Sequence, residues 1–173
     1  MRKILIVVDM QNDFVDGSLG TKEAEAIVEN VRNKILSYPE RDVVVTLDTH
    51  GEDYLDTQEG KNLPVVHCVR GTEGWQLNPR IAEVTRNAKV FEKPTFGSVR
   101  LAESLKQLSE WENLELELVG LCTDICVVSN ALLLKAAMPE VPISVDSSCC
   151  AGVTPESHDH ALATMGACQI QVK

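Results

Sequence analysis

Short runs of Ile, Leu and Val alternate along the chain with stretches in which apolar residues recur every three or four positions. The short runs predict β-strands, because strands buried on both faces are near-continuous aliphatic segments. The longer stretches predict helices with one apolar face. The predicted strands cover residues 3–8, 42–47, 89–92, 114–119, 141–145 and 168–172. The predicted helices cover 22–36 and 154–165, with two more that begin at Ser98 and just after Gly120.

Strand and helix alternate about six times, and this order determines the predicted fold. Parallel strands joined by helices form a sheet with helices on both faces. We therefore predict one domain over residues 1–173, with a three-layer α/β/α architecture of the Rossmann-like kind around a six-stranded parallel sheet. Ligands bind such sheets beyond the carboxyl ends of the strands, so the residues that follow the strands are the first candidates for a functional site.

The segment 120–127, Gly-Leu-Cys-Thr-Asp-Ile-Cys-Val, carries the candidate nucleophile. A strand pattern stops here and a helical pattern begins, so Thr123 or Asp124 is predicted to cap the helix. Cys126 then falls in the first turn, where free N–H groups and the helix dipole favour an anion. We expect its pKa to lie below the usual value of about 8.5. The sequence predicts that Cys126 is the reactive thiol of a hydrolase.

Four polar residues each follow a different predicted strand, namely Asp9, Asp48, Lys93 and Cys126. The carboxyl ends of parallel strands share one edge, so these side chains are expected to meet. Asp9 is the candidate general base for the thiol, and Lys93 supplies positive charge that favours thiolate and carboxylate. Alone, Asp9 would be read as a turn residue and Lys93 as a solvated lysine. Together at one edge they favour a catalytic function.

Asp48-Thr-His50 and His67 form a second group of functional candidates. Two imidazoles and one carboxylate suit Zn²⁺, Fe²⁺ or Mn²⁺. From spacing alone, a hydrogen-bonded set of polar loop residues explains the pattern equally well. Residues 51–64 show neither strand nor helix periodicity and are predicted to form a long loop, the kind that often acts as a lid or binding loop.

Composition and charge narrow the classes of partner. The formal charge of −10 argues against nucleic acids and anionic membranes, which require clustered Lys and Arg. The apolar start of the chain ends at Asp9 and is too short for a signal peptide. A cytoplasmic location is expected, in which the six cysteines stay reduced. Cys149-Cys150 is predicted to be a buried pair of thiols rather than a redox pair.

Three separated motifs carry a resemblance to a known family. In this order, the chain resembles the isochorismatase-like cysteine hydrolases at three motifs. They are Val-Asp9-Met-Gln-Asn-Asp-Phe14, Lys93-Pro-Thr-Phe96-Gly and the segment 120–127. The resemblance implies a catalytic triad of Asp9, Lys93 and Cys126. It also implies a cis peptide between Leu121 and Cys122, and an oxyanion hole formed by the backbone N–H groups of Cys122 and Cys126.

Within that family, Asp48-x-His50 followed by His67 resembles the metal-binding nicotinamidase branch. This implies a divalent metal, zinc in the first place and iron or manganese otherwise, held by Asp48, His50 and His67. Phe14, Phe96 and Trp75 are the predicted substrate-binding residues. Members of the branch usually carry Trp-Pro before the third ligand, whereas this chain has Leu63-Pro64, and the loop 51–64 lacks a further histidine. Trp75 is a candidate replacement for the missing Trp, or else a loop anchor.

The predicted activity is hydrolysis of a small carboxamide, nicotinamide in the first place, to acid and ammonia through a thioester on Cys126. One alternative is an amidase that acts on a different small amide. A second is a metal-binding or small-molecule-binding member of the family with weak turnover. A third is redox signalling through Cys122 and Cys126, which the helical spacing disfavours. The expected partners are a small-molecule amide and, by the family resemblance, further copies of this chain.

Overall fold

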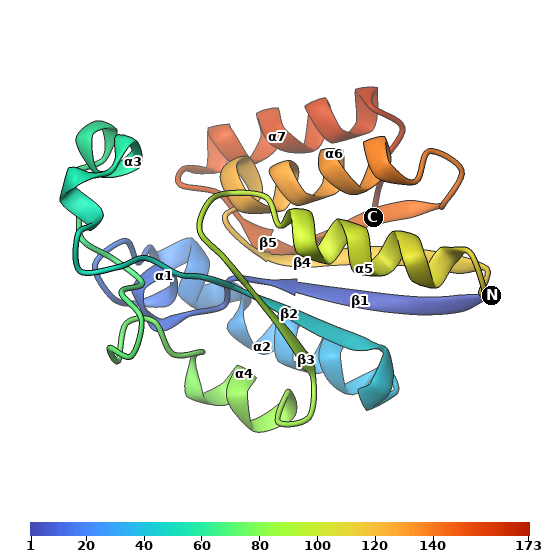
Figure 1. The fold of residues 1–173 in the computed structure, drawn as a ribbon, viewed down its shortest axis with the longest axis horizontal. Coiled ribbons are helices and arrows are strands. Elements are labelled where there is room, and N and C mark those ends of the chain that lie inside the picture. The colour runs from blue at the N-terminus through green and yellow to red at the C-terminus, as the bar shows by residue number, and fades with distance from the viewer.

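The computed structural model describes residues 1–173 and contains one twisted sheet in which all strands run parallel (Figure 1). The six strands follow the order β3-β2-β1-β4-β5-β6, so the chain starts near the middle of the sheet and winds outwards in both directions. The strands are β1 (Arg2–Val8), β2 (Val43–Asp48), β3 (Lys89–Lys93), β4 (Leu114–Leu121), β5 (Ile143–Ala151) and β6 (Gln171–Val172).

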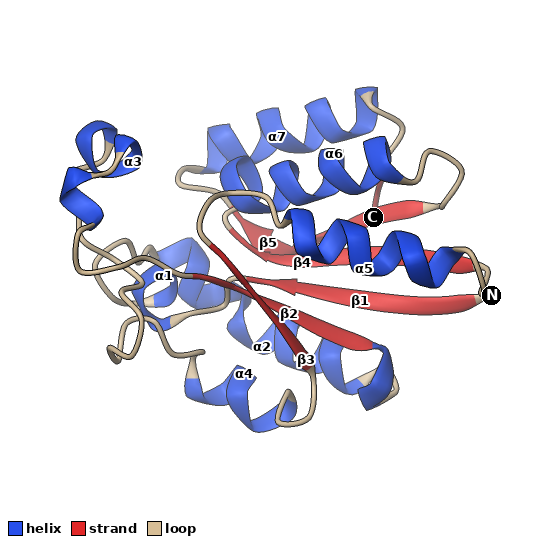
Figure 2. Ribbon diagram, viewed as in Figure 1, coloured by secondary structure: helices blue, strands red, loops and turns tan.

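Helices cover both faces of the sheet, which confirms the predicted three-layer fold (Figure 2). On one face, the apolar side chains of α1, α2 and α4 pack into one core, and on the other those of α5, α6 and α7 form a second core. No helix is both long enough and apolar enough to cross a membrane. The helices are α1 (Asn12–Val15), α2 (Lys22–Leu36), α3 (Gln58–Asn62), α4 (Pro79–Val84), α5 (Val99–Ser109), α6 (Val128–Ala137) and α7 (Pro155–Ala167).

The contact between β1 and β4 brings the first strand end close to the nucleophile segment. Val8 is in register with Gly120, and a Cβ atom at position 120 would lie 2.1 Å from the carbonyl oxygen of Val8. Gly120 also has a φ of +117°, which residues with a side chain rarely adopt. Glycine is therefore required where β4 passes the end of β1, one residue before Asp9.

Segment 51–64 and the last two strands differ from the sequence prediction. The segment 51–64 contains a 3₁₀ turn at Tyr54–Asp56 and helix α3, which stands beyond the carboxyl edge of the sheet (Figure 1). The hydroxyl of Thr57 caps α3 by accepting from Gly60 N at 3.0 Å, a local bond that apolar periodicity does not reveal. Strand β5 begins later than predicted and extends to Ala151, while β6 is reduced to Gln171–Val172.

Candidate active site

Three buried side chains from three strand ends meet at the carboxyl edge of the sheet. Nζ of Lys93 lies 2.6 Å from Oδ2 of Asp9 and 3.3 Å from Sγ of Cys126. The same ammonium lies 3.3 Å from Oδ1 of Asp48 and donates to the carbonyl of Thr95 at 3.0 Å. Lys93 and Asp48 are also register partners in the sheet. The structure thus brings together all four polar residues that the sequence places after strands.

The surroundings raise the pKa of each of the three groups. Loss of hydration raises the pKa of the Asp9 carboxyl, and the charge of Lys93 opposes this only in part. Burial lowers the pKa of Lys93, but the negative charges around the ammonium outweigh burial and raise it. Burial, followed by the charge of Asp9, raises the pKa of the Cys126 thiol well above its usual value. The expectation of a depressed pKa at Cys126 is therefore wrong, because the thiol is desolvated and faces a carboxylate.

The two carboxyl oxygens of Asp9 have different surroundings. Oδ1 accepts a hydrogen bond from the hydroxyl of Thr46 at 2.6 Å. Oδ2 is buried and lies 2.6 Å from the ammonium of Lys93. Asp9 has a φ of +47°, a left-handed conformation that turns the chain at the end of β1. The carboxyl group is therefore held on one side by Thr46 and on the other by Lys93.

The turn that carries Cys126 has an unusual backbone. The peptide between Leu121 and Cys122 is cis, as expected, and a π-helical turn at Thr123–Val127 follows before α6 begins. Val127 N donates across the turn to the carbonyl of Cys122 at 3.0 Å, whereas the N–H of Cys122 donates to no backbone carbonyl. The turn has no side-chain cap, so the prediction that Thr123 or Asp124 caps it is wrong.

The hydroxyl and carboxylate expected at that cap bind elsewhere. Thr123 Oγ1 lies 2.7 Å from Nδ1 of His158 in α7, and Asp124 Oδ1 accepts from Val153 N at 3.1 Å. Both contacts tie the nucleophile turn to the segment that follows β5. These tertiary contacts compete with the local capping bond, and the wider π-turn removes the usual capping geometry.

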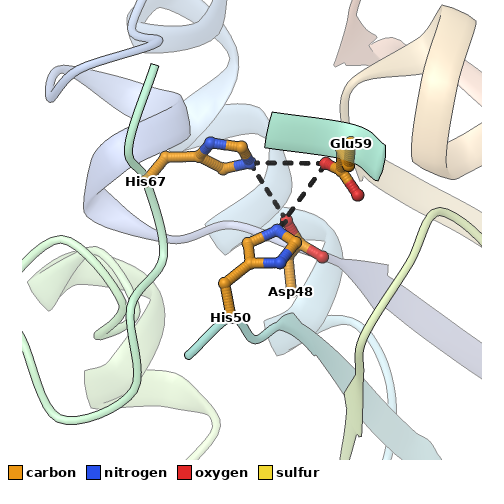
Figure 3. Close-up of side chains that lie close together, drawn as sticks. All are labelled: Asp48, His50, Glu59 and His67. Atoms are coloured by element: carbon orange, nitrogen blue, oxygen red, sulfur yellow. Dashed lines mark hydrogen bonds and ion pairs between the residues drawn. The ribbon is translucent and has the colours of Figure 1, made fainter. Parts of the chain in front are cut away.

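A cluster of four possible metal ligands lies beside the triad (Figure 3). Nε2 of His50 and Nε2 of His67 lie 3.0 and 3.4 Å from Oδ2 of Asp48. Oε1 of Glu59 faces both rings, at 3.6 Å from His50 and 3.8 Å from His67. All four ligand atoms lie within 4.8 Å of one another. Glu59 is not among the predicted ligands, because segment 51–64 shows no helical period and contains no histidine.

The geometry of this cluster fits a divalent ion. Nδ1 of His67 lies 2.8 Å from the carbonyl of Val65, and since a carbonyl only accepts, Nδ1 carries the proton. The other nitrogen, Nε2, faces Asp48 and Glu59, and in a neutral ring it carries the lone pair that a metal ion requires, as in metal sites whose imidazole is oriented by a second hydrogen bond. Two imidazole nitrogens and two carboxylates match the ligand preferences of Zn²⁺ and also suit Fe²⁺ or Mn²⁺.

Side chains that follow β1 hold this cluster in place. Gln11 is fully buried, and its amide exchanges two hydrogen bonds with the backbone of Asp48, at 2.8 and 2.9 Å. Asp13 Oδ2 accepts from Cys68 N at 2.8 Å and thereby fixes the residue next to His67. The motif from Asp9 to Phe14 thus connects the triad to the cluster of possible metal ligands.

A small apolar pocket opens beside Sγ of Cys126. Its volume is about 180 Å³, and it reaches Asp48, Glu59 and His67 on one side. Phe14 and Phe96 line it, and their role in substrate binding stays a prediction. Trp75 does not line it. The other lining residues are Leu19, Thr21, Leu63, Cys122, Ile125 and Val153.

Trp75 instead anchors a loop. Its indole N–H donates to the hydroxyl of Thr49 at 2.9 Å, and its ring packs against the core that contains α2. The loop-anchor alternative therefore describes its position, and the structure gives no support to Trp75 as a substrate-binding residue. No aromatic ring replaces the expected tryptophan at Leu63, whose side chain forms part of the pocket wall.

The isochorismatase domain model matches residues 3–172 of this chain. The chain belongs to this family. The nicotinamidase of Escherichia coli is 28% identical over 197 residues, which cover 94% of this chain and 89% of that protein. The crystal structure of the nicotinamidase/pyrazinamidase PncA from Bacillus subtilis has a TM-score of 0.83 and 30% identity, with 99% of each chain covered.

A pyrazinamidase of Pyrococcus horikoshii, solved in complex with zinc, is a further structural neighbour of this isochorismatase-family chain. It has a TM-score of 0.80 and 25% identity, and the match covers 100% of this chain and 99% of that chain. The relatives and neighbours indicate an amidohydrolase of the isochorismatase family, in agreement with the class predicted from the sequence.

Proposed function

We propose that this protein hydrolyses a small carboxamide to the acid and ammonia, and that nicotinamide is its substrate. The observation that carries the proposal is the buried contact of Lys93 Nζ with both Asp9 Oδ2 and Cys126 Sγ, at 2.6 and 3.3 Å. These atoms lie beside a small apolar pocket with a metal-ligand cluster on one wall. The named activities of the E. coli, B. subtilis and P. horikoshii proteins support the same class of substrate.

In the acylation step, Asp9 takes the proton of the Cys126 thiol as the sulfur attacks the amide carbon. The raised pKa of Asp9 makes it a stronger base than an exposed aspartate, and Lys93 offsets the negative charge that moves to sulfur. The N–H groups of Cys122 and Cys126 are the proposed donors to the oxyanion. Asp9 then gives its proton to the nitrogen, the C–N bond breaks, and ammonia leaves a thioester on Cys126.

In the deacylation step, Asp9 takes a proton from water, and the resulting hydroxide attacks the thioester carbon. The same oxyanion donors hold the second tetrahedral intermediate. When the C–S bond breaks, the carboxylic acid is released and the proton on Asp9 returns to the sulfur. Lys93 stays protonated throughout, because the acidic groups around its ammonium keep its pKa raised.

Asp48, His50, Glu59 and His67 are the residues that would hold the metal, with zinc as the preferred ion. When bound, a divalent ion supplies a Lewis-acid contact for the ring nitrogen of a pyridine carboxamide. Phe14 and Phe96 contribute the apolar surface against which the ring packs. Asp48 brings the ligand cluster close to the triad. Its Oδ1 faces Lys93, and its Oδ2 faces the histidines.

An ammonia-release assay with nicotinamide tests the proposal. We expect steady release by the wild type, loss on treatment with a chelator and recovery on adding Zn²⁺. Cys126→Ala should release no ammonia while keeping the same metal content, because Cys126 is outside the ligand cluster. Cys168→Ala, at an exposed cysteine, is the matched control and should behave as the wild type. Full activity in Cys126→Ala would refute the mechanism.

Leu63 supports a second candidate, an amidase that acts on a different small amide. The pocket has an aliphatic side chain where a stacking tryptophan was expected, so a flat ring is held less tightly than in enzymes that have the tryptophan. Comparing kcat/KM for nicotinamide, pyrazinamide and aliphatic amides separates the two candidates. The first predicts the highest value for a ring amide, and the second for an aliphatic one.

A further inference from the structure

Asn130 is a buried amide close to the candidate nucleophile. It lies in α6, four residues after Cys126, and is 1% exposed. Its Nδ2 donates to the carbonyl of Cys126 at 2.8 Å and to the carbonyl of Phe96 at 3.1 Å, and its Oδ1 accepts from Ser98 N at 2.9 Å. Each of these backbone groups would lose a partner if the amide were removed, which is costly in a buried place.

The three bonds join segments that are far apart in the sequence. One is the turn that carries Cys126, and the other is the connection 94–98, which runs from the end of β3 to the start of α5 (Figure 1). That connection begins directly after Lys93 and includes Phe96 of the pocket wall. Between Lys93 itself and the turn there is one side-chain hydrogen bond, from Nζ to Sγ of Cys126 at 3.3 Å. The link through Asn130 is therefore a second, independent tie between these segments.

We propose that Asn130 is a positioning residue, which holds the Cys126 turn against the 94–98 connection so that Sγ stays next to Lys93 and Phe96 stays on the pocket wall. The proposal rests on the proposed function of Cys126 and Lys93. Asn130 touches neither the sulfur nor the pocket, so its effect on the reaction is through the backbone of Cys126 and Phe96.

The chemistry of the amide explains why asparagine is suited to this position. A serine or threonine in a helix can donate to the carbonyl four residues earlier, here that of Cys126, but its short side chain gives no bridge to a neighbouring segment. An aspartate would place a second acceptor against the carbonyl oxygens of Cys126 and Phe96. A leucine of similar size would leave Ser98 N and both carbonyls without this partner.

The test compares Asn130→Ser and Asn130→Ala with Asn78→Ala. Asn78 is also a buried asparagine, and its Oδ1 accepts from Arg80 N at 3.1 Å as the cap of α4, while its side chain bonds to none of the triad residues. The measurements are the melting temperature, kcat and KM for nicotinamide, and the rate of Cys126 alkylation by iodoacetamide as a function of pH. Peptide mass spectrometry assigns the alkylation to Cys126 rather than to the other cysteines.

Asn130→Ser retains the bond within the helix and loses the bond to the connection. We expect it to fold, to lose about 10- to 100-fold in kcat, and to show a changed pH profile of Cys126 alkylation, because the sulfur is displaced from Lys93 and Asp9. Asn130→Ala should show the same changes to a greater degree. Asn78→Ala should have a lower melting temperature but the wild-type kcat and alkylation midpoint.

A folded Asn130→Ser protein with the wild-type kcat and alkylation midpoint would overturn the proposal, even if its melting temperature falls. If Asn130→Ala fails to fold, the kcat and the alkylation profile of Asn130→Ser test the proposal on their own. The alkylation profile needs no substrate, so it also separates this proposal from the proposed function. A changed alkylation profile in a chain that releases no ammonia from nicotinamide would support the positioning role and refute the substrate.

Discussion

The ammonium of Lys93 lies 2.6 Å from Oδ2 of Asp9, and neither side chain is exposed to solvent. Two charges in such a place are stable only together, because each would be costly to bury alone. The pair should therefore matter for folding and, under the proposed function, for catalysis. Activity and stability should respond differently when one or both partners are removed.

Asp9→Asn and Lys93→Met should each lower the free energy of unfolding by about 3 kcal/mol. This is the low end of the range for breaking a buried ion pair, because Asp48 remains near Lys93. The double variant should recover part of that loss, because no unpaired charge of this pair remains. All three should lose about 10²- to 10⁴-fold in ammonia release. Urea unfolding and a steady-state assay check both expectations. A double variant that is less stable than either single variant would contradict them.

Glu59 should contribute to metal affinity, because Oε1 lies within 3.8 Å of both imidazoles. We expect Glu59→Gln to weaken binding at least about tenfold, through loss of one negative ligand. Titration with Co²⁺, followed by its visible absorption, measures the affinity without an activity assay. Glu52→Gln, at an exposed acid in the same segment, is the control and should bind as the wild type. Equal affinity of both variants would remove Glu59 from the site.

Leu63→Trp should restore a stacking surface in the pocket. An aromatic pair contributes about 0.5–1.5 kcal/mol beyond burial, so KM for nicotinamide should fall about two- to tenfold with little change in kcat. Leu55→Trp places the same side chain on an exposed position outside the pocket and should leave KM unchanged. A lower KM in both variants would point to a nonspecific effect.

Glu117 of β4 should make stability depend on pH in the acid range. Its side chain accepts from the Tyr38 hydroxyl and lies 3.2 Å from Nζ of Lys173 and 3.4 Å from Nζ of Lys34. Burial alone would raise the pKa of Glu117, but the Tyr38 bond and the two lysines outweigh burial and lower it. A carboxyl group with a lowered pKa in the folded state stabilises the protein above its unfolded pKa, about 4.3.

The wild type should therefore be more stable than Glu117→Gln near pH 7, and the difference should shrink as the pH falls below about 4.3. Urea unfolding at a series of pH values measures it. Glu110→Gln, at an exposed acid without an ion pair, should match the wild type at every pH. A difference between wild type and Glu117→Gln that does not change with pH would rule out ionisation of Glu117 as its source.

The sequence predicted the fold because its signals are local and repeated. Helix α2 has the predicted bounds, Lys22–Leu36, since its apolar residues follow a 3.6-residue period and Thr21 caps it. The aliphatic runs of β1 and β2 are likewise plain in the sequence. Helix α4 was missed although Asn78 and Pro79 form a regular start, because only two turns follow.

Site features that arise from contacts between distant segments were harder to predict. The meeting of four side chains could be predicted, because the carboxyl ends of parallel strands lie at the same edge of the sheet. These side chains are Asp9, Asp48, Lys93 and Cys126. The pKa of Cys126 was predicted in the wrong direction, because the helix position was visible in the sequence and the burial beside Asp9 was not. Glu59 and Asn130 gave no signal of their own, since each depends on how a distant segment folds back onto the site.

The two halves of the site differ in how they are encoded. Asp9, Lys93 and Cys126 come from three separate strand ends, so none can move without the sheet. Asp48, His50, Glu59 and His67 all lie in one continuous stretch of twenty residues, most of it outside the sheet. This stretch can therefore be exchanged as one piece of chain while Asp9, Lys93 and Cys126 stay in place on the sheet. Under the proposed function, segment 49–67 is the place to graft new substrate specificity.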